Sequence, residues 1–202
     1  TAYRRQRQMC IRDRHEGDSI DVWAYSNCDE VQLTVNGRNL GRQSMPKNGH
    51  LSWKTVYRPG TVKAVGYKNG RKVLVRTVET TGEPARIRLS AEHLAASAAC
   101  RAIAVVRVEL QDRKQRFVPT ACKELTLTVS GPVRILGVGN GNPAFQDVER
   151  PTDASARTFR VNTFNGLAQV LLQATGEAGE AVLTVSGEGL PDAVYSYPVA
   201  AE

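Results

Sequence analysis

Short runs of alternating β-branched and polar residues, separated by glycine, proline and asparagine, constrain the fold of this chain more than any other feature. Because successive side chains of a strand point to opposite faces, Val31, Leu33 and Val35 share one face and the polar residues between them share the other. Asn36-Gly37 follows directly and suits the positive φ angles of a two-residue type I′ turn. The pattern therefore predicts a β-hairpin that turns at Asn36-Gly37.

A second Asn-Gly pair predicts a second hairpin further along the chain. Residues Thr61–Tyr67 and Lys72–Val78 are both rich in β-branched residues, and Lys68-Asn69-Gly70-Arg71 connects them. A short polar stretch, Thr80-Thr81-Gly82-Glu83-Pro84, comes next and ends in a proline that restricts its preceding residue to extended conformations. We place a domain boundary there, between a small domain at residues 15–82 and a larger one at residues 83–202. The stretch is too short for a flexible linker, so we expect the two domains to abut.

The second domain shows the same punctuated alternation. Eight short strands separated by turn residues are typical of a β-sandwich. They are expected at Ala85–Leu89, Ile103–Leu110, Leu125–Val129, Val133–Val138, Thr158–Val161, Ala168–Ala174, Ala181–Ser186 and Ala193–Val199. The alanine-rich Leu94–Cys100 favours at most one turn of helix. The fold class predicted for the chain is all-β, with two consecutive sandwich domains.

The first fourteen residues differ from the rest. They hold five arginines and one aspartate, whereas the other 188 residues carry 22 basic and 19 acidic side chains. This segment lacks apolar periodicity and resembles translated adaptor sequence, so we expect residues 1–14 to be disordered and non-native; a native basic arm is the alternative. The near balance of charge elsewhere argues against nucleic acid as a partner. Without an initiating methionine, the chain is expected to be a piece of a longer protein.

Neither apolar runs nor cysteines indicate a membrane protein or a metal protein. The longest apolar run, Ala102–Val106, is far shorter than the ~20 residues of a membrane helix. Apart from Cys10, the cysteines are Cys28, Cys100 and Cys122, with no Cys-x-x-Cys pair, so we expect no metal site. Buried reduced thiols are the favoured interpretation, and a Cys100–Cys122 disulfide is the alternative.

The acidic residues and histidines predict no catalytic site. Groups that share acid and base work must lie close together. Asp29 and Glu30 are adjacent and would point to opposite faces of a strand, and Asp147 and Glu149 lie in a loop without an evident base. The histidines fall one to a region, at positions 15, 50 and 93. We therefore expect surface charges and no catalytic residue.

Gly137–Pro143 contains glycines after a strand, as a dinucleotide-binding loop does. The third glycine of that fingerprint would fall at Asn142, however, and Pro143 does not open a helix that could hold a pyrophosphate. We expect no cofactor. Asparagine and glycine tolerate positive φ, so Asn140, Gly141, Asn142 and Pro143 are predicted to form a rigid loop that serves as a docking surface.

Three aromatic residues are the candidates for ligand contact, because flat or partly apolar ligands stack on aromatic rings. Trp23 and Tyr25 share one face of an expected strand, and the other face is also apolar, with Ile20, Val22 and Ala24. A packing contact is the favoured role of Trp23 and Tyr25, and a ligand platform is the alternative. Trp53 lies in what resembles a core strand, so burial is favoured for it, with sugar contact again the alternative.

Five segments, which together span most of the chain, carry a family resemblance. They are SNCDEVQLTVNGRNLG (Ser26–Gly41), HLSWKTVYRPGTVKAVGYKNGRKV (His50–Val73), TTGEPARIRLS (Thr80–Ser90), SGPVRILGVGNGNP (Ser130–Pro143) and FNGLAQVLLQATGEAGEAVLTVSGEGL (Phe164–Leu190). The first two resemble the small β-sandwich that follows the catalytic barrel in many glycoside hydrolases of family 2, the β-galactosidase group. The other three resemble the C-terminal immunoglobulin-like domain of the same enzymes. Asn142, where an aspartate is common, and the stretch between Asp147 and Arg157 depart from the family pattern.

The resemblance implies two consecutive immunoglobulin-like sandwich domains from a bacterial multidomain retaining glycosidase. The family's barrel and its two catalytic glutamates have no counterpart here, so no residue inherits a catalytic role. It implies a non-catalytic fragment that packs on and supports the barrel, with the barrel and other parent domains as partners, an oligosaccharide as a possible ligand, and a periplasmic or extracellular location. A free-standing carbohydrate-binding module and an immunoglobulin-like adhesin segment are the alternative functions.

Overall fold

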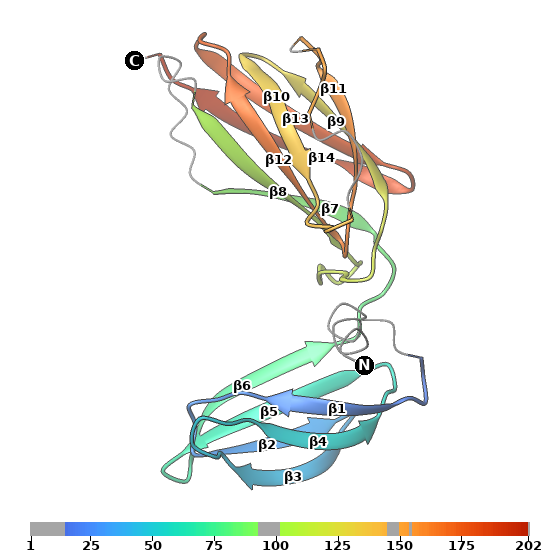
Figure 1. Cartoon of the computed structure of the whole chain (residues 1–202), viewed down its shortest axis with the longest axis vertical. Helices are drawn as coiled ribbons and strands as arrows, with labels where there is room; N and C mark the ends of the chain where they lie inside the picture. Colours follow the sequence, from blue (N-terminus) through green and yellow to red (C-terminus); the bar gives the residue numbers. More distant parts are fainter. Residues whose placement is uncertain (1–14, 93–101, 145–149, 154, 202) are drawn as a thin grey trace. The chain divides into compact units, whose positions relative to one another are not determined.

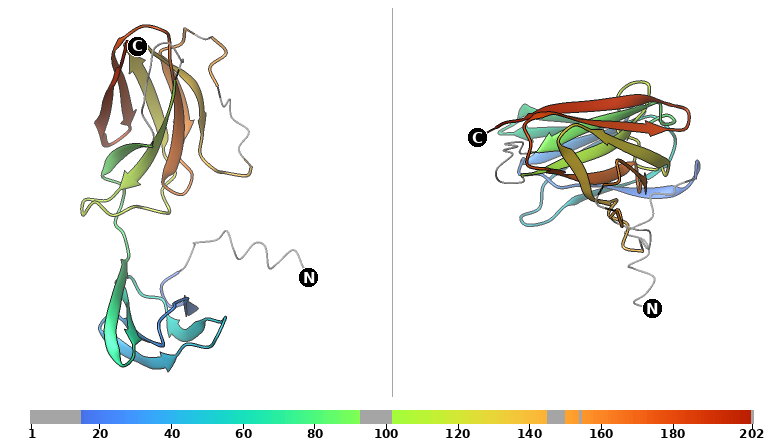
Figure 2. Two further views of the ribbon diagram at one scale, coloured as in Figure 1. Left: turned by 90° about the vertical axis from the view of Figure 1, so that its left-hand side faces the viewer. Right: turned by 90° about the horizontal axis from the view of Figure 1, so that it is seen from above.

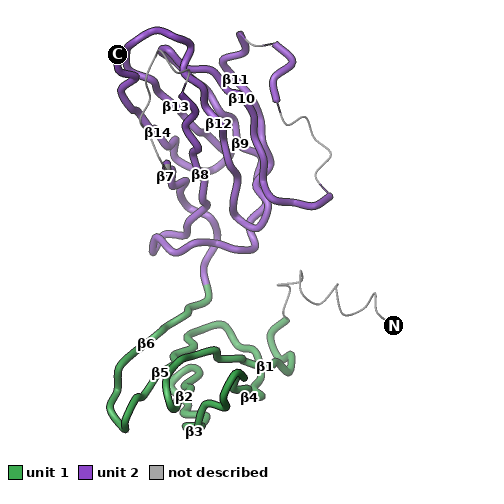
Figure 3. Tube along the Cα trace, turned by 60° about the vertical axis from the view of Figure 1, so that its left-hand side comes forward, with its two compact units in different colours: residues 1–80 green, residues 81–202 purple. Residues whose placement is uncertain are grey.

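The computed structural model describes residues 15–92, 102–144, 150–153 and 155–201, and every regular element in these ranges is a strand. The all-β prediction is confirmed. The chain divides into two compact units, residues 1–80 and 81–202 (Figure 3). The domain limits expected from the sequence, 15–82 and 83–202, stay a prediction. Three other predictions concern positions outside the described residues. They are the disorder of residues 1–14, the helical turn at Leu94–Cys100, and the loop position of Asp147 and Glu149.

Unit 1 is built from six strands in two sheets (Figure 1). The strands are β1 (Ser19–Ala24), β2 (Glu30–Val35), β3 (Arg38–Ser44), β4 (Leu51–Val56), β5 (Thr61–Lys68) and β6 (Arg71–Glu79). One sheet has the order β3-β2-β5-β6 and the other pairs β1 with β4, all antiparallel. Alternation explains the core, since Val31 and Leu33 of β2 and Leu51 and Trp53 of β4 form one buried cluster.

Both predicted hairpins are present. Asn36 and Gly37, with φ angles of 49° and 81°, connect β2 to β3. Asn69 and Gly70, with φ angles of 50° and 74°, connect β5 to β6. Positive φ at both central residues is the requirement of the type I′ turn, which explains why asparagine and glycine stand at these corners.

Unit 2 contains the eight expected strands, arranged in two facing four-stranded sheets (Figures 1 and 2). The strands are β7 (Arg86–Glu92), β8 (Ile103–Gln111), β9 (Glu124–Ser130), β10 (Val133–Gly139), β11 (Thr158–Asn162), β12 (Leu167–Ala174), β13 (Gly179–Gly187) and β14 (Leu190–Val199). One sheet has the order β10-β12-β8-β7 and the other β11-β9-β13-β14. This is the β-sandwich that the punctuated alternation predicts.

The core of unit 2 is a single cluster of alternating side chains from both sheets. Val106, Val108 and Leu110 of β8 are buried together with Leu125 and Leu127 of β9 and with their counterparts on β12 and β13. Burial of this much aliphatic surface is the main stabilising term for the unit. None of the elements within the described ranges is a helix of the length and hydropathy needed to cross a bilayer.

The cysteine prediction is correct at one position and wrong at another. Cys28 is a buried free thiol, whereas Cys122 is a free thiol exposed to solvent. The cause is a contact with a distant segment: the buried Ala121 accepts a backbone hydrogen bond from Gly166 at 2.7 Å, which holds this loop with Ala121 inward and leaves the Cys122 side chain exposed. Cys100, the other half of the alternative disulfide, is outside the described residues.

Candidate functional site

An exposed aromatic cluster lies on the outer face of the two-stranded sheet of unit 1. Trp23 and Tyr25 are 57% and 70% exposed, and both rings contact His50. The ring centroids of Trp23 and His50 are 4.7 Å apart, and those of Tyr25 and His50 are 5.3 Å apart. The cluster offers aromatic surface to solvent, which is the property that stacking against a flat or partly apolar ligand requires.

His50 was not singled out from the sequence as part of this cluster. It comes to Tyr25 through the pairing of β1 with β4, in which Ala24 lies opposite Leu51. Local periodicity predicts that each segment is a strand, but it does not predict which distant strand pairs with it. The available signal was parity, because Leu51 and Trp53 point inward and position 50 therefore points outward.

Trp53 lies in the core, on the opposite face of the same sheet. Its side chain is 5% exposed, and the register places Ser52, not Trp53, opposite Trp23. The indole Nε1 donates no hydrogen bond within the described part of the chain. The favoured interpretation, core packing, is confirmed, and the surface cluster contains only two of the three predicted aromatic candidates.

The loop at Asn140–Pro143 is held by its own asparagine side chains. The Asn140 Oδ1 accepts a hydrogen bond from the Asn142 backbone N–H at 2.9 Å, and the Asn142 Oδ1 accepts one from the Ala144 N–H at 3.0 Å. The Asn140 Nδ2 also donates to the Asn162 carbonyl at 2.8 Å, which ties the loop to the end of β11. These bonds account for a defined loop shape. The docking role of the loop stays a prediction.

Three carboxylates, those of Asp29, Glu30 and Glu109, are bound by hydrogen-bond donors or cations of this chain. Asp29 accepts a hydrogen bond from the Asn69 backbone N–H at 2.7 Å, and Glu30 forms an ion pair with Arg42. Glu109 is paired with Arg107 at 3.1 Å. These are structural roles, and none of these contacts joins two carboxylates. The described ranges also hold no group of three or more metal-ligating side chains.

Among the described carboxylates, Asp112 has the most strongly shifted pKa, and it anchors a loop. It is buried, and its Oδ2 accepts hydrogen bonds from the Arg116 guanidinium at 2.6 and 2.9 Å and from the Gly82 backbone N–H at 3.0 Å. The Arg116 side chain, followed by backbone N–H donors, holds the pKa of this carboxyl well below its usual range although burial opposes the shift. Because all of these partners belong to the chain itself, Asp112 stabilises the fold and offers no free group for chemistry.

Two family models match the chain, one in each unit. Residues 17–74 match a domain of unknown function, DUF4982, and residues 87–196 match the glycoside hydrolase family 2 C-terminal domain 5. Among curated relatives, "Beta-galactosidase BoGH2A" of Bacteroides ovatus is 37% identical over 180 residues, and a "Putative beta-glucuronidase" of Formosa agariphila is 29% identical over 174 residues. These alignments cover 88% and 85% of this chain but 20% and 16% of the relatives.

Solved structures agree with the sequence matches. A glycosyl hydrolase family 2 member from Bacteroides cellulosilyticus has a TM-score of 0.80 at 30% identity, and a β-glycosidase from Bacteroides vulgatus has 0.78 at 32%. Each comparison covers 91% of this chain and 23% of the other protein, so the chain spans about a fifth of the length of its relatives. Since one family model covers more than half of the chain, the chain belongs to the glycoside hydrolase family 2 C-terminal domain 5 family and resembles the C-terminal accessory region of these enzymes.

Proposed function

We propose that this chain is the non-catalytic C-terminal part of a β-galactosidase-like enzyme of glycoside hydrolase family 2, and that it packs on and supports the catalytic barrel in carbohydrate degradation. The observation that carries the proposal is the match of residues 87–196 to a C-terminal domain of this family. The identity of 37% to a β-galactosidase over 180 residues supports it across both units. We also propose a periplasmic or extracellular location, on the family relationship alone.

The proposal has two testable parts. The purified chain should not hydrolyse chromogenic β-galactosides or β-glucuronides, since its partnered carboxylates are engaged by structural donors. The reading frame upstream of residue 15 should encode a barrel, and an enzyme truncated before residue 15 should have a lower melting temperature than the complete enzyme. Turnover by the purified chain, or equal melting temperatures, would contradict the proposal. An upstream frame of further sandwich domains would favour the adhesin function instead.

The exposed aromatic cluster favours a second candidate, carbohydrate binding. Trp23 and Tyr25 present two rings to solvent on the sheet face away from the core. A pyranose ring has an apolar C–H face that stacks on such rings. Isothermal calorimetry with galacto-oligosaccharides tests this function: binding should be lost in Trp23→Ala and kept in Val78→Ala, a substitution at another exposed apolar side chain of unit 1. Equal affinities of the two variants would remove this candidate.

A further inference from the structure

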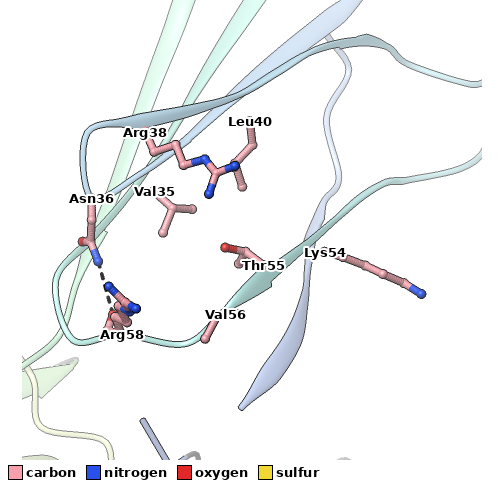
Figure 4. Close-up of a pocket in the computed structure, with 8 residues that line it drawn as sticks. All are labelled: Val35, Asn36, Arg38, Leu40, Lys54, Thr55, Val56 and Arg58. Carbon is pink, nitrogen blue, oxygen red and sulfur yellow. Dashed lines mark hydrogen bonds between the residues drawn. The ribbon is translucent and has the colours of Figure 1, made fainter. Parts of the chain in front are cut away.

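A cleft of about 520 Å³ opens within unit 1 between β3 of one sheet and β4 of the other. Eight residues line it, from the β2–β3 hairpin on one side and from β4 and the following loop on the other (Figure 4). They are Val35, Asn36, Arg38, Leu40, Lys54, Thr55, Val56 and Arg58. The volume lies in the range of pockets that bind ligands.

Two strand edges face this cleft. β3 is the terminal strand of its sheet, and β4 pairs only with β1 among the described strands. Side chains tie the two edges at both ends of the opening. The Gln43 Nε2 donates to the Ser52 carbonyl at 3.4 Å, and the Asn36 Nδ2 donates to the Arg58 and Pro59 carbonyls at 3.4 Å each. Between these ties β4 has a free edge, whereas β3 bulges at Leu40-Gly41 and its Gly41 N–H donates to the Asn39 Oδ1 at 2.9 Å, so β4 is the edge that can pair with another segment.

The lining combines an aliphatic floor with uncompensated positive charge. Val35 and Leu40 supply the aliphatic part, Thr55 points toward Val35, and the Arg38 side chain extends between the two strands (Figure 4). Lys54 and Val56 share the other face of β4 and point away. Arg38, Lys54 and Arg58 form no ion pair with any described residue, and no carboxylate lines the cleft. The contrast with Arg42 is informative, because this neighbour on β3 is paired with Glu30 and stacks on Tyr67.

We propose that this cleft binds an extended, acidic segment of polypeptide from outside this chain. An inorganic anion would leave the aliphatic floor uncovered, and a sugar would find no aromatic ring among the lining residues. An extended peptide meets all three features: its backbone pairs with a free strand edge, an aliphatic side chain covers the floor, and carboxylates accept hydrogen bonds from Arg38 and Arg58. This inference does not depend on the proposed function.

The test uses the complete ¹⁵N-labelled chain and a blocked pentapeptide of alternating glutamate and valine. Saturable amide shifts are expected in the cleft residues. The double variant Arg38→Gln with Arg58→Gln should weaken binding by about tenfold or more, because two charged hydrogen bonds are lost. The matched control, Arg71→Gln with Arg76→Gln, removes the same charge from β6 of the same unit and should bind like the wild type.

Three outcomes would overturn the proposal. The first is an absence of cleft shifts at millimolar peptide, and the second is equal weakening in the two double variants. The third is tighter binding of trigalacturonate than of the peptide at the same residues, which would make the cleft a site for acidic sugars. Amide spectra of both double variants without peptide establish that each variant is folded.

Discussion

At the scale of single residues, Asn36 shows how one side chain serves two elements at once. Its backbone adopts the positive φ of the hairpin turn, and its Oδ1 accepts a hydrogen bond from the Thr61 backbone N–H at 2.6 Å. The neighbouring Gly60 has room for no side chain, because a Cβ there would lie 1.9 Å from the Asn36 Oδ1. The turn asparagine therefore also fixes the start of β5. The Asn-Gly pattern predicts the turn, but not the second contact.

Replacing Asn36 separates these two roles. We expect Asn36→Ala to lower the free energy of unfolding of unit 1 by about 1 kcal/mol more than Asn69→Ala does. Both positions have a φ near 50°, so the backbone cost is shared, but only the Asn36 side chain binds another loop. Urea unfolding followed by tryptophan fluorescence measures the difference, since Trp23 and Trp53 both lie in unit 1. Equal losses would show that the side-chain bonds add nothing.

Asp112 should make the stability of unit 2 depend on pH. Its pKa is lower in the folded chain than in the unfolded chain, so the ionised carboxylate stabilises the fold above the ordinary pKa of ~3.9, and this stabilisation is lost as the pH falls toward the folded pKa. We expect Asp112→Asn to lower the urea midpoint at pH 7 and the gap to the wild type to narrow below about pH 4.

The comparison for Asp112 is Asp192→Asn, at an exposed aspartate on β14. This control should leave the urea midpoint unchanged at either pH. If the urea midpoints of Asp112→Asn and the wild type differ by the same amount at pH 7 and at pH 3, the charge of Asp112 does not stabilise the loop. Circular dichroism at fixed urea steps is sufficient to measure these midpoints.

At the scale of strands and turns, local pattern predicted the elements but not their partners. Alternating valine, leucine and threonine predicted β9, and Asn-Gly pairs predicted two corners, because both signals act between neighbouring residues. Sheet order depends on contacts between distant segments. The pairing of β1 with β4 brings His50 to Trp23, and neither alternation nor composition contains that information. The exposure of Cys122 depends in the same way on how the loop before β9 meets Gly166.

Gly131, in the turn between β9 and β10, should tolerate no side chain. Gly131 has a φ of 80°, and a Cβ there would lie 2.0 Å from the Glu180 carbonyl oxygen of β13. Gly141 has a similar φ of 75° with no atom within 4 Å of an added Cβ. We expect Gly141→Ala to cost about 1 kcal/mol from backbone strain, and Gly131→Ala to cost roughly 1 to 3 kcal/mol more from overpacking. Urea unfolding of unit 2 followed by circular dichroism measures both, and equal costs would contradict the crowding.

At the scale of the whole molecule, the two units differ greatly in core size. Among the residues that the structure describes, unit 1 has a cluster of four buried side chains and unit 2 has a cluster of 24. Since apolar burial supplies most of the stabilisation, unit 1 should be the weaker of the two. Length and turn spacing predicted two sandwiches. They did not predict the size of each core, because core size depends on how the sheets of each unit pack against one another.

This difference predicts two unfolding steps. In hydrogen exchange at increasing urea, amides of β2 and β5 should lose protection before amides of β8 and β12. Fluorescence of Trp53 in a Trp23→Phe variant should follow the first step, because Trp53 is the buried tryptophan of unit 1. Leu127→Ala, at a fully buried position of unit 2, serves as the control. It should lower the free energy of unfolding of the second step by about 2 to 5 kcal/mol and leave that of the first step unchanged. A single shared transition would contradict the prediction.

The order of strands in unit 2 has a consequence for the newly made chain. β8 lies between β7 and β12, and β9 lies between β11 and β13, so neither sheet is complete until its last strands have been translated. Until then β8 and β9 present uncovered apolar faces at the ribosome exit, whereas every strand of unit 1 has already emerged. The period of greatest risk of aggregation during synthesis therefore falls between the appearance of β9 and that of β13.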